Sequence, residues 1–340
     1  MVHRKRIAVT LPAGPRVEDT INRIKWAEEN GIPDAWFSDS GAPDTLTQVA
    51  AVAHTTHDIR IGTAVTPVYT RSPSVLAASA NVIGQLLPGR FIMGLGSSSQ
   101  TIMTQFNGIP LDKPVTRVKE TAQLVKELLT GAKTDFDGDT LFSKGYRQAP
   151  LENPPPVYLA ALRPKMIEMA ADVGDGVIFN LWPKKALPKM MEHVAVGAKN
   201  AGKDPQDLEI VNRAMVLCTD DKEYGRNVFR AAFGPYYGTP VYNNFLAWAG
   251  YEAEAAGIAE GWAAKDRDKT AGSMSDEMID EIAIIGNEDE VRERIQEDAD
   301  GGVDTHIIAP MAGRLKTLKG LSTRSWARLF SSQRRVLAGD

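Results

Sequence analysis

Short runs of apolar, β-branched residues alternate along the chain with longer segments of helical period. The first run, 7–11, is followed by Val17, Ile21 and Ile24, which lie four and three residues apart and therefore share one helix face. Gly31 then stands where a glycine with positive φ commonly ends a helix. This alternation predicts strands joined by helices, as in a parallel sheet.

Eight strands are predicted in all, and a helical segment follows each of them. Pro73 is placed for the first position of an apolar helix, and Asn287 with Glu290 three residues later forms a capping box. The predicted strands lie at 7–11, 35–38, 59–66, 91–95, 157–161, 176–180, 209–218 and 303–309. The predicted helices lie at 17–31, 46–54, 73–87, 118–129, 164–173, 190–201, 222–233, 287–299 and 315–329.

Eight such units fit a closed (β/α)8 TIM barrel, with an open doubly wound sheet plus a second domain as the alternative. Two stretches, near 131–156 and 234–281, exceed normal connections and are expected to be insertions. The second is rich in aromatic residues, so we expect it to be helical and to cover another surface. Because no linker or low-complexity tract divides the chain, residues 1–340 are expected to form a single domain.

Composition narrows the classes of function. The 340 residues carry 39 Lys and Arg against 43 Asp and Glu, and this mildly acidic balance argues against nucleic acid as a partner. No apolar run approaches the roughly 20 residues of a membrane span, and no signal-peptide core follows the basic N-terminus, so we expect a cytoplasmic protein. The single cysteine, Cys218, excludes a disulfide framework and a multi-cysteine metal site. No metal is expected; Cys218 is interpreted as a small buried hydrophobe and His306 as a satisfied core histidine.

The active site of such a barrel lies at the C-terminal ends of its strands. The strongest local signal there is Gly-Leu-Gly-Ser-Ser-Ser at 94–99, in which small residues and hydroxyls favour a phosphate. The alternative is a solvated glycine-serine turn. Asp39, an acid at the end of the second strand, could accept a hydrogen bond from a cofactor ring or a substrate; the alternative is a helix or turn cap.

Five segments, in order and over nearly the whole chain, resemble the bacterial luciferase-like superfamily and specifically its coenzyme F420-dependent oxidoreductases. They are Asp-Ala-Trp-Phe-Ser-Asp at 34–39, Ile-Gly-Thr-Ala-Val-Thr-Pro at 61–67 with Arg-Ser-Pro at 71–73, Pro-Gly-Arg-Phe-Ile-Met-Gly-Leu-Gly-Ser-Ser at 88–98, Pro-Val-Tyr-Leu-Ala-Ala at 156–161 and Ala-Asp-Val-Gly-Asp-Gly-Val at 171–177. The resemblance implies a barrel with insertions, a homodimer, and hydride transfer between the deazaflavin and a small organic substrate.

The resemblance also implies roles for individual residues. Ala64 and Val65 match the family's non-prolyl cis peptide behind the deazaflavin ring, and Asp39 matches the acid near that ring. Ser97 and Ser98 match the loop that holds the cofactor phosphate, and Ala160 and Ala161 match a backbone site beside that phosphate. The expected cofactor-binding residues are Asp39, Thr63, Ala64, Val65, Gly96, Ser97, Ser98, Ser99, Ala160, Ala161, Leu162 and Arg163. Candidates by position for a basic rim around the cofactor's anionic tail are Arg163, Lys165, Lys184 and Lys185.

Two residues differ from the family's pattern and narrow the range of reactions. Ser40 stands where the sugar-phosphate and alcohol dehydrogenase branches have a histidine, and Ser99 stands where they have a glutamate. Their absence argues against oxidation of glucose 6-phosphate or simple alcohols and leaves reduction of an electron-poor double bond, imine or carbonyl. Asp39 and Ser40 are the catalytic candidates, with water or Tyr69 as other proton donors. Two alternatives stay open: an FMN-dependent monooxygenase of the same superfamily, and a cofactor-binding relative without turnover.

Overall fold

The structure is a computed structural model, and it describes residues 5–10, 16–39 and 43–311. Eight parallel strands close into a barrel in the order β1, β2, β3, β5, β8, β9, β10, β12, with β12 paired to β1. The predicted (β/α)8 barrel is therefore confirmed. The barrel strands are β1 (Arg6–Thr10), β2 (Asp34–Phe37), β3 (Arg60–Thr63), β5 (Phe91–Gly96), β8 (Val157–Ala160), β9 (Gly176–Asn180), β10 (Glu209–Cys218) and β12 (Thr305–Pro310).

Two strands differ from the prediction. The strand expected at 59–66 is split into β3 and a short β4 (Thr66–Pro67), because the bond between Ala64 and Val65 is cis, as the resemblance implied. A short strand, β11 (Ile284–Gly286), was not predicted; it pairs with the C-terminal half of β10.

The predicted helices are present with small changes at their ends. Gly31 has a φ of +71°, Pro73 opens its helix, and Asn287 with Glu290 forms the expected capping box. The helix expected to end at 233 continues to Tyr237, and the predicted closing helix at 315–329 lies outside the described residues. The helices around the barrel are α1 (Val17–Glu29), α2 (Thr45–Ala53), α3 (Pro73–Leu86), α4 (Pro114–Leu129), α5 (Pro164–Val173), α6 (Leu187–Asn200), α7 (Lys222–Tyr237) and α12 (Glu288–Asp300), with short helical turns at η1 (Thr101–Phe106), η2 (Lys184–Ala186) and η3 (Pro205–Asp207).

Side chains fill the barrel interior in layers. At the N-terminal end, Arg60 bonds to both Asp34 and Glu209, which also accepts hydrogen bonds from Tyr158 (2.7 Å) and Thr305 (2.6 Å). The layer above is apolar and consists of Ala8, Trp36, Ile92, Tyr158, Ile178, Val211 and Ile307. These two layers close the lower part of the barrel, so the C-terminal mouth is left for chemistry.

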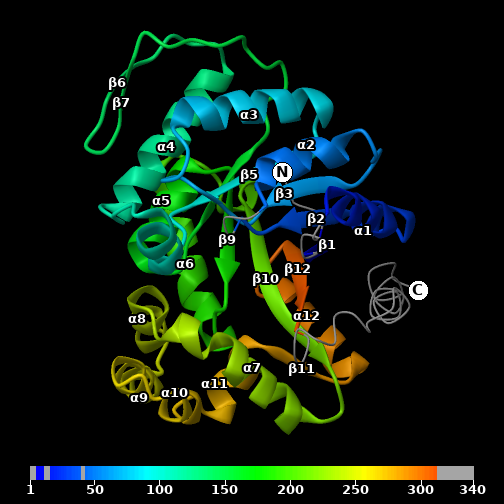
Figure 1. Cartoon of the computed structure of the whole chain (residues 1–340), viewed down its shortest axis with the longest axis vertical. Helices are drawn as coiled ribbons and strands as arrows, with labels where there is room; N and C mark the ends of the chain where they lie inside the picture. Colours follow the sequence, from blue (N-terminus) through cyan, green and yellow to red (C-terminus); the bar gives the residue numbers. More distant parts are fainter. Residues whose placement is uncertain (1–4, 11–15, 40–42, 312–340) are drawn as a thin grey trace.

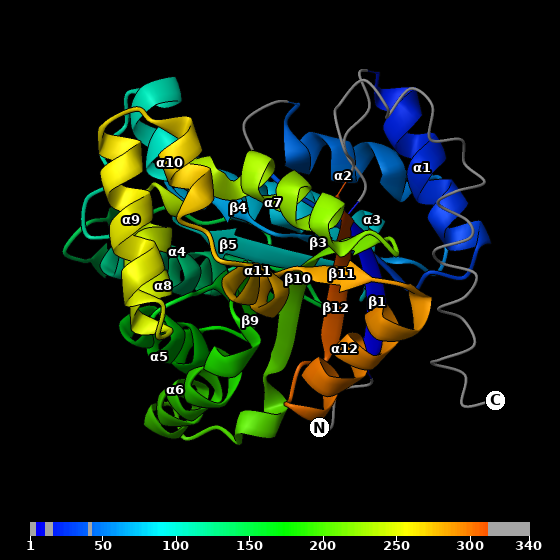
Figure 2. The same cartoon turned by 90° about the horizontal axis from the view of Figure 1, so that it is seen from below.

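Both predicted insertions are present. The stretch 131–156 holds the antiparallel hairpin of β6 (Asp135–Asp137) and β7 (Phe142–Lys144), and 234–281 holds α8 (Pro240–Trp248), α9 (Glu252–Ala263), α10 (Arg267–Gly272) and α11 (Asp276–Ile282). Figure 1 shows α7 to α11 gathered at one end of the molecule, opposite the hairpin. Seen from that end, α7 and α11 lie across the strands (Figure 2).

The helical insertion covers part of the barrel mouth. It forms a second apolar core that includes Leu181, Met215 and Ala309 from the ends of barrel strands, and the Tyr237 hydroxyl donates to the Leu181 carbonyl at 3.0 Å. The expectation that this segment is helical and covers another surface is thus confirmed. No helix in the described part of the chain is long and apolar enough to cross a membrane.

Two interpretations of single residues need correction. Cys218 is exposed rather than buried, because β10 extends beyond the barrel wall and ends there. His306 is a core residue, but its Nε2 atom is buried without a hydrogen-bond partner, and burial lowers its pKa to about 3.

Candidate active site

The alternation of side chains along the strands determines which residues reach the mouth. Val211 on β10 and Ile178 on β9 belong to the apolar layer inside the barrel. Because successive residues of a strand point to opposite faces, Arg213 and Asn180 point inward one layer nearer the mouth. The same step on β8 leads from Tyr158 to Ala160.

One sector of the mouth is built from β3, β5 and β8 and has a flat, mostly apolar floor. The Thr63 hydroxyl is fully buried and bonds to the backbone carbonyl (2.8 Å) and N–H (2.9 Å) of Gly94, so it is engaged within the protein. A Cβ atom added to Gly96 would lie 2.6 Å from Val65 Cγ2 and 3.1 Å from Ala160 Cβ. Only glycine fits at this position, because Val65 and Ala160 leave no room for a Cβ atom.

The serine loop follows this floor directly. Ser98 has a φ of +62°, the left-handed conformation, which is found in the backbone concavities that bind anions. No described residue accepts a hydrogen bond from the N–H of Ser98 or Ser99. The Ser99 hydroxyl is already used, because it accepts from the N–H of Ile102 (3.3 Å) at the start of η1. The backbone around Ser97 and Ser98 can therefore hold an anion.

The neighbouring site at the end of β8 is only partly available. The N–H of Ala161 donates to the carbonyl of Ile178 (3.0 Å), which leaves the half-buried Leu162 and the exposed Arg163 before α5 to face a ligand. The loop thus offers fewer free backbone donors than the resemblance implies.

The candidate basic rim is reduced to two residues. Lys184 bonds to Glu297, and Lys185 lies 3.8 Å from Glu277 and 3.5 Å from the centre of the Tyr251 ring. The other two candidates, Arg163 and Lys165, are exposed and form no ion pair with any described residue.

Asp39 lies at the mouth beyond the end of β2. Its carboxylate is buried and lies 3.0 Å from Nη1 of Arg71, which also bonds to Asp44. Asp44 is the residue that caps α2, by accepting the N–H of Thr47 (2.8 Å), so Asp39 does not cap this helix. Ser40, the other catalytic candidate, lies outside the described residues.

The hydroxyl of Tyr69, a further proton-donor candidate, is engaged elsewhere. It donates to the carbonyl of Asp112 (2.5 Å), and burial raises its pKa. The phenol is therefore held as a structural donor.

Arg213 was not anticipated from the sequence. Its side chain is half-buried at the mouth, where Nη1 lies 3.4 Å from Oδ1 of Asn180 while Nε is buried without a partner. Desolvation lowers the pKa of its guanidinium. The available signal was a lone cation inside a mostly apolar predicted strand.

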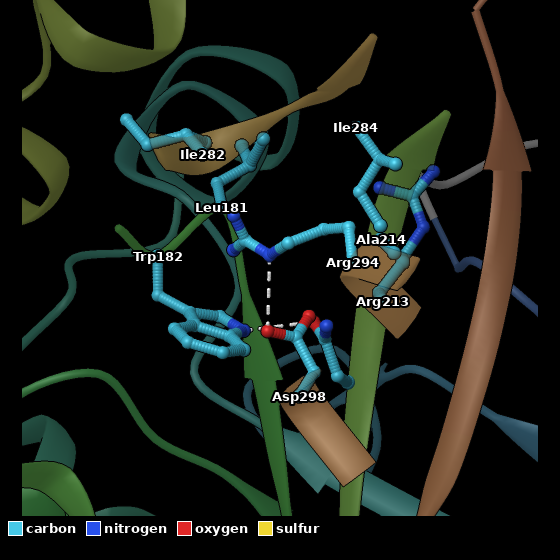
Figure 3. A pocket seen from close by; sticks show the side chains of 9 residues that line it. Leu181, Trp182, Arg213, Ala214, Ile282, Ile284, Arg294 and Asp298 are labelled. Carbon is cyan, nitrogen blue, oxygen red and sulfur yellow. Dashed lines mark hydrogen bonds and ion pairs between the residues drawn. The ribbon is translucent and has the colours of Figure 1, made fainter. Parts of the chain in front are cut away.

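A small pocket lies on the other face of β10, against α12. Its polar groups satisfy one another: Trp182 Nε1 donates to Asn212 Oδ1 (2.8 Å), and Arg294 pairs with Asp298 (3.1 Å). Figure 3 shows the Arg213 side chain turned away from Trp182, Arg294 and Asp298. Arg213 also lines this pocket, but its guanidinium points away from these paired groups.

Comparisons with known proteins agree with this architecture. Residues 1–305 match the model of the family described as luciferase-like monooxygenase. The chain is 31% identical to 5,10-methylenetetrahydromethanopterin reductase of Methanolobus tindarius over 88% of its own length and 91% of the relative. It is 31% identical to F420-dependent glucose-6-phosphate dehydrogenase of Mycolicibacterium gilvum over 58% of its length and 64% of that relative.

A solved structure has the same fold. The coenzyme F420-dependent tetrahydromethanopterin reductase from Methanopyrus kandleri superimposes with a TM-score of 0.80 at 20% identity, covering 97% of this chain and 98% of that one. Because the family model matches residues 1–305 and a relative is 31% identical over 88% of the chain, the chain belongs to the luciferase-like monooxygenase family.

Proposed function

We propose that this protein is a coenzyme F420-dependent oxidoreductase that reduces a methylene-bridged tetrahydropterin. The observation that carries the proposal is the near full-length similarity to a methylenetetrahydromethanopterin reductase, whereas the similarity to a glucose-6-phosphate dehydrogenase covers 58% of the chain. Ser40 and Ser99 support it, because they replace the histidine and glutamate that the resemblance associates with sugar and alcohol oxidation.

The mouth fits a cofactor of this kind. The small residues Ala64, Gly96 and Ala160 at the ends of neighbouring strands suit the close approach of a flat ring, and the N–H groups of Ser98 and Ser99 suit its phosphate. The exposed Arg163 and Lys165 suit the anionic tail. When bound, the deazaflavin supplies a hydride, and the protein's contribution is to hold ring and substrate close together.

The reaction also needs one proton. Reduction of a methylene bridge to a methyl group consumes a hydride at the carbon and a proton at the nitrogen released when the bridge opens. Because Arg71 is ion-paired with Asp39, the Asp39 carboxylate is stabilised as a hydrogen-bond acceptor that orients its ligand. Ser40 or a water held beside Asp39 is then our candidate for delivering the proton.

The proposal is tested in two steps. F420 and FMN are first titrated against the purified protein and followed by fluorescence; we expect tight binding of F420. Reduced F420 is then mixed with 5,10-methylenetetrahydromethanopterin, its folate counterpart and, in the reverse direction, oxidised F420 with glucose 6-phosphate. Turnover with a methylene-bridged pterin supports the proposal. Tight FMN binding without F420 binding would favour the monooxygenase alternative, and F420 binding without turnover would favour the relative that lacks catalysis.

We further propose that the chain forms a single domain, that it acts as a homodimer, and that it works in the cytoplasm. The family resemblance supports the dimer, and the exposed, free Cys218 is typical of a reducing compartment. Light scattering on the purified protein should give twice the 37.0 kDa mass of the chain.

A further inference from the structure

Arg213 faces the cis peptide bond across the barrel mouth. In the order of the eight strands, β3 is third and β10 is seventh, so the two lie on opposite walls. The bond between Ala64 and Val65 follows β3 directly, and Arg213 points inward from β10. Any ligand stacked on a ring above Val65 therefore has Arg213 on its other side.

No charge among the described residues compensates the guanidinium of Arg213. Among the described residues, no carboxylate forms an ion pair with it, its single hydrogen bond to Asn180 is long at 3.4 Å, and its Nε is buried without an acceptor. Outside the described ranges the sequence contains one further acidic residue, Asp340. A desolvated charge without a partner destabilises the folded protein, and such groups are concentrated at functional sites.

The groups around Arg213 are also donors. Asn180 uses its oxygen for Arg213 and its Nδ2 for the hydroxyl of Tyr242 (2.8 Å). Burial raises the pKa of Tyr242, so this phenol keeps its proton and can donate it onward. A wall made of a guanidinium and a phenol favours a ligand that presents an electron-rich oxygen.

We infer that Arg213 anchors the substrate by donating hydrogen bonds to an electron-rich oxygen, which in a tetrahydropterin is the ring carbonyl. This inference rests on the proposed function for the identity of the ring. Arg213 lies deep in the mouth, opposite the position of the cofactor ring, so it meets the reacting end of the substrate rather than the tail. Asn180 and Tyr242 are positioning residues, because they orient Arg213 and narrow the wall.

The test compares two arginines on opposite sides of β10, both visible in Figure 3. Arg213→Met removes the uncompensated charge but keeps an unbranched apolar stem; Arg294→Met removes a guanidinium that is already paired with Asp298 (3.1 Å) and with the carbonyl of Glu281 (3.0 Å). Melting temperatures are measured without ligand. We expect Arg213→Met to melt at or above the wild-type temperature and Arg294→Met to melt below it.

Binding is measured by calorimetry with two probes, tetrahydrofolate and the tail-less 6-methyltetrahydropterin, in the presence of F420. Arg213→Met should bind both probes about ten- to a hundred-fold more weakly, because each loses a charge-assisted hydrogen bond. Arg213→Lys should recover part of this loss, whereas F420 affinity and the affinities of Arg294→Met should stay within about two-fold of wild type.

Other results of these measurements would contradict specific parts of the inference. Equal pterin affinity in wild type and Arg213→Met, or a fall in melting temperature like that of Arg294→Met, would overturn the inference. A loss confined to tetrahydrofolate would show that Arg213 binds the tail carboxylate and would overturn the ring assignment. If the wild type binds neither probe, the proposed function fails. The melting temperatures then still decide whether the Arg213 charge destabilises the folded protein or stabilises it through contacts.

Discussion

The guanidinium of Arg71 is shared by two carboxylates with different tasks. Asp44 caps α2 and is half exposed, whereas Asp39 is buried at the mouth. We therefore predict that Asp39→Asn weakens F420-dependent turnover about ten- to a hundred-fold, the effect of losing one charge-assisted hydrogen bond. Asp44→Asn is the matched control: it removes the same charge from Arg71, keeps a good helix cap, and should leave kcat and KM nearly unchanged. Equal effects of the two variants would mean that Asp39 only supports Arg71.

Ser98 allows a second prediction about single residues. If its N–H faces the cofactor phosphate, a carboxylate added by Ser98→Asp lies close to that phosphate, and like charges about 4 Å apart repel by about 4 kcal/mol at an effective dielectric of 20. We expect up to a thousand-fold weaker F420 binding in a fluorescence titration, partly rescued by salt.

Two variants at the same position act as controls. Ser98→Ala keeps the N–H and should cost far less affinity, and Ser98→Gly suits the φ of +62° and should be neutral or slightly stabilising. Comparable F420 affinity in wild type and Ser98→Asp would show that the loop does not hold the phosphate.

Helix α7 connects the barrel to the helical insertion that covers part of its mouth. Tyr237 on α7 is fully buried and donates to the Leu181 carbonyl at the end of β9, whereas Tyr224 on the same helix is 48% exposed. Tyr237→Phe should lower the free energy of unfolding by about 1–3 kcal/mol, because it leaves a buried carbonyl without a donor. Tyr224→Phe should change it by less than about 0.5 kcal/mol. Urea denaturation gives both values, and hydrogen exchange should show faster opening of α7 and α8 in the first variant only.

Most elements of the fold could be predicted because their signals are local. Apolar runs marked the barrel strands, and Gly31, Pro73 and Asn287 marked helix ends that the structure retains. The strand at 59–66 was predicted too long because a cis bond leaves no trace in hydrophobic periodicity. The strand at 284–286 was missed because three residues beside a helix cap are too few to show a period.

The site was predictable only where it consists of backbone. Glycines and serines at 94–99 indicated a loop that approaches a ligand, and in the described part of the chain the N–H groups of Ser98 and Ser99 have no acceptor. The role of Arg213 depends instead on strand order, since only closure of the barrel places it opposite Val65. Similarly, the burial of Asp39 by Arg71 depends on a contact between residues 32 positions apart.

At the scale of the whole molecule, one buried network joins the strands at the closed end of the barrel. Arg60 on β3 bonds to Asp34 on β2 and to Glu209 on β10, and Glu209 also accepts from Tyr158 on β8 and Thr305 on β12. The bonds to Arg60, Thr305 and Tyr158 outweigh desolvation and lower the pKa of Glu209 to about 2. Strands far apart in sequence are thereby held by one carboxylate.

This shift predicts how stability depends on pH. A folded-state pKa of about 2, against 4.5 for the free group, contributes about 3 kcal/mol that is present above pH 4.5 and is lost as the pH falls toward 2. Glu209→Gln should therefore be less stable than wild type by about that amount at pH 7, and the difference should vanish near pH 2. Burial raises the pKa of Asp34, and the charge of Glu209 raises it further, so the comparison of the two proteins in urea reports Glu209 together with its effect on Asp34. A constant difference across this range would contradict the assignment.

The two walls of the barrel mouth come from different halves of the chain. The floor and the serine loop lie before residue 164, whereas Asn180, Arg213 and Tyr242 lie after it. Substitutions in the second half therefore alter the wall that faces the substrate without touching the floor that faces the cofactor, whereas the catalytic candidates Asp39 and Ser40 stay in the first half. For the same reason, chimeras that exchange the second half between relatives should change substrate preference without redesign of the first.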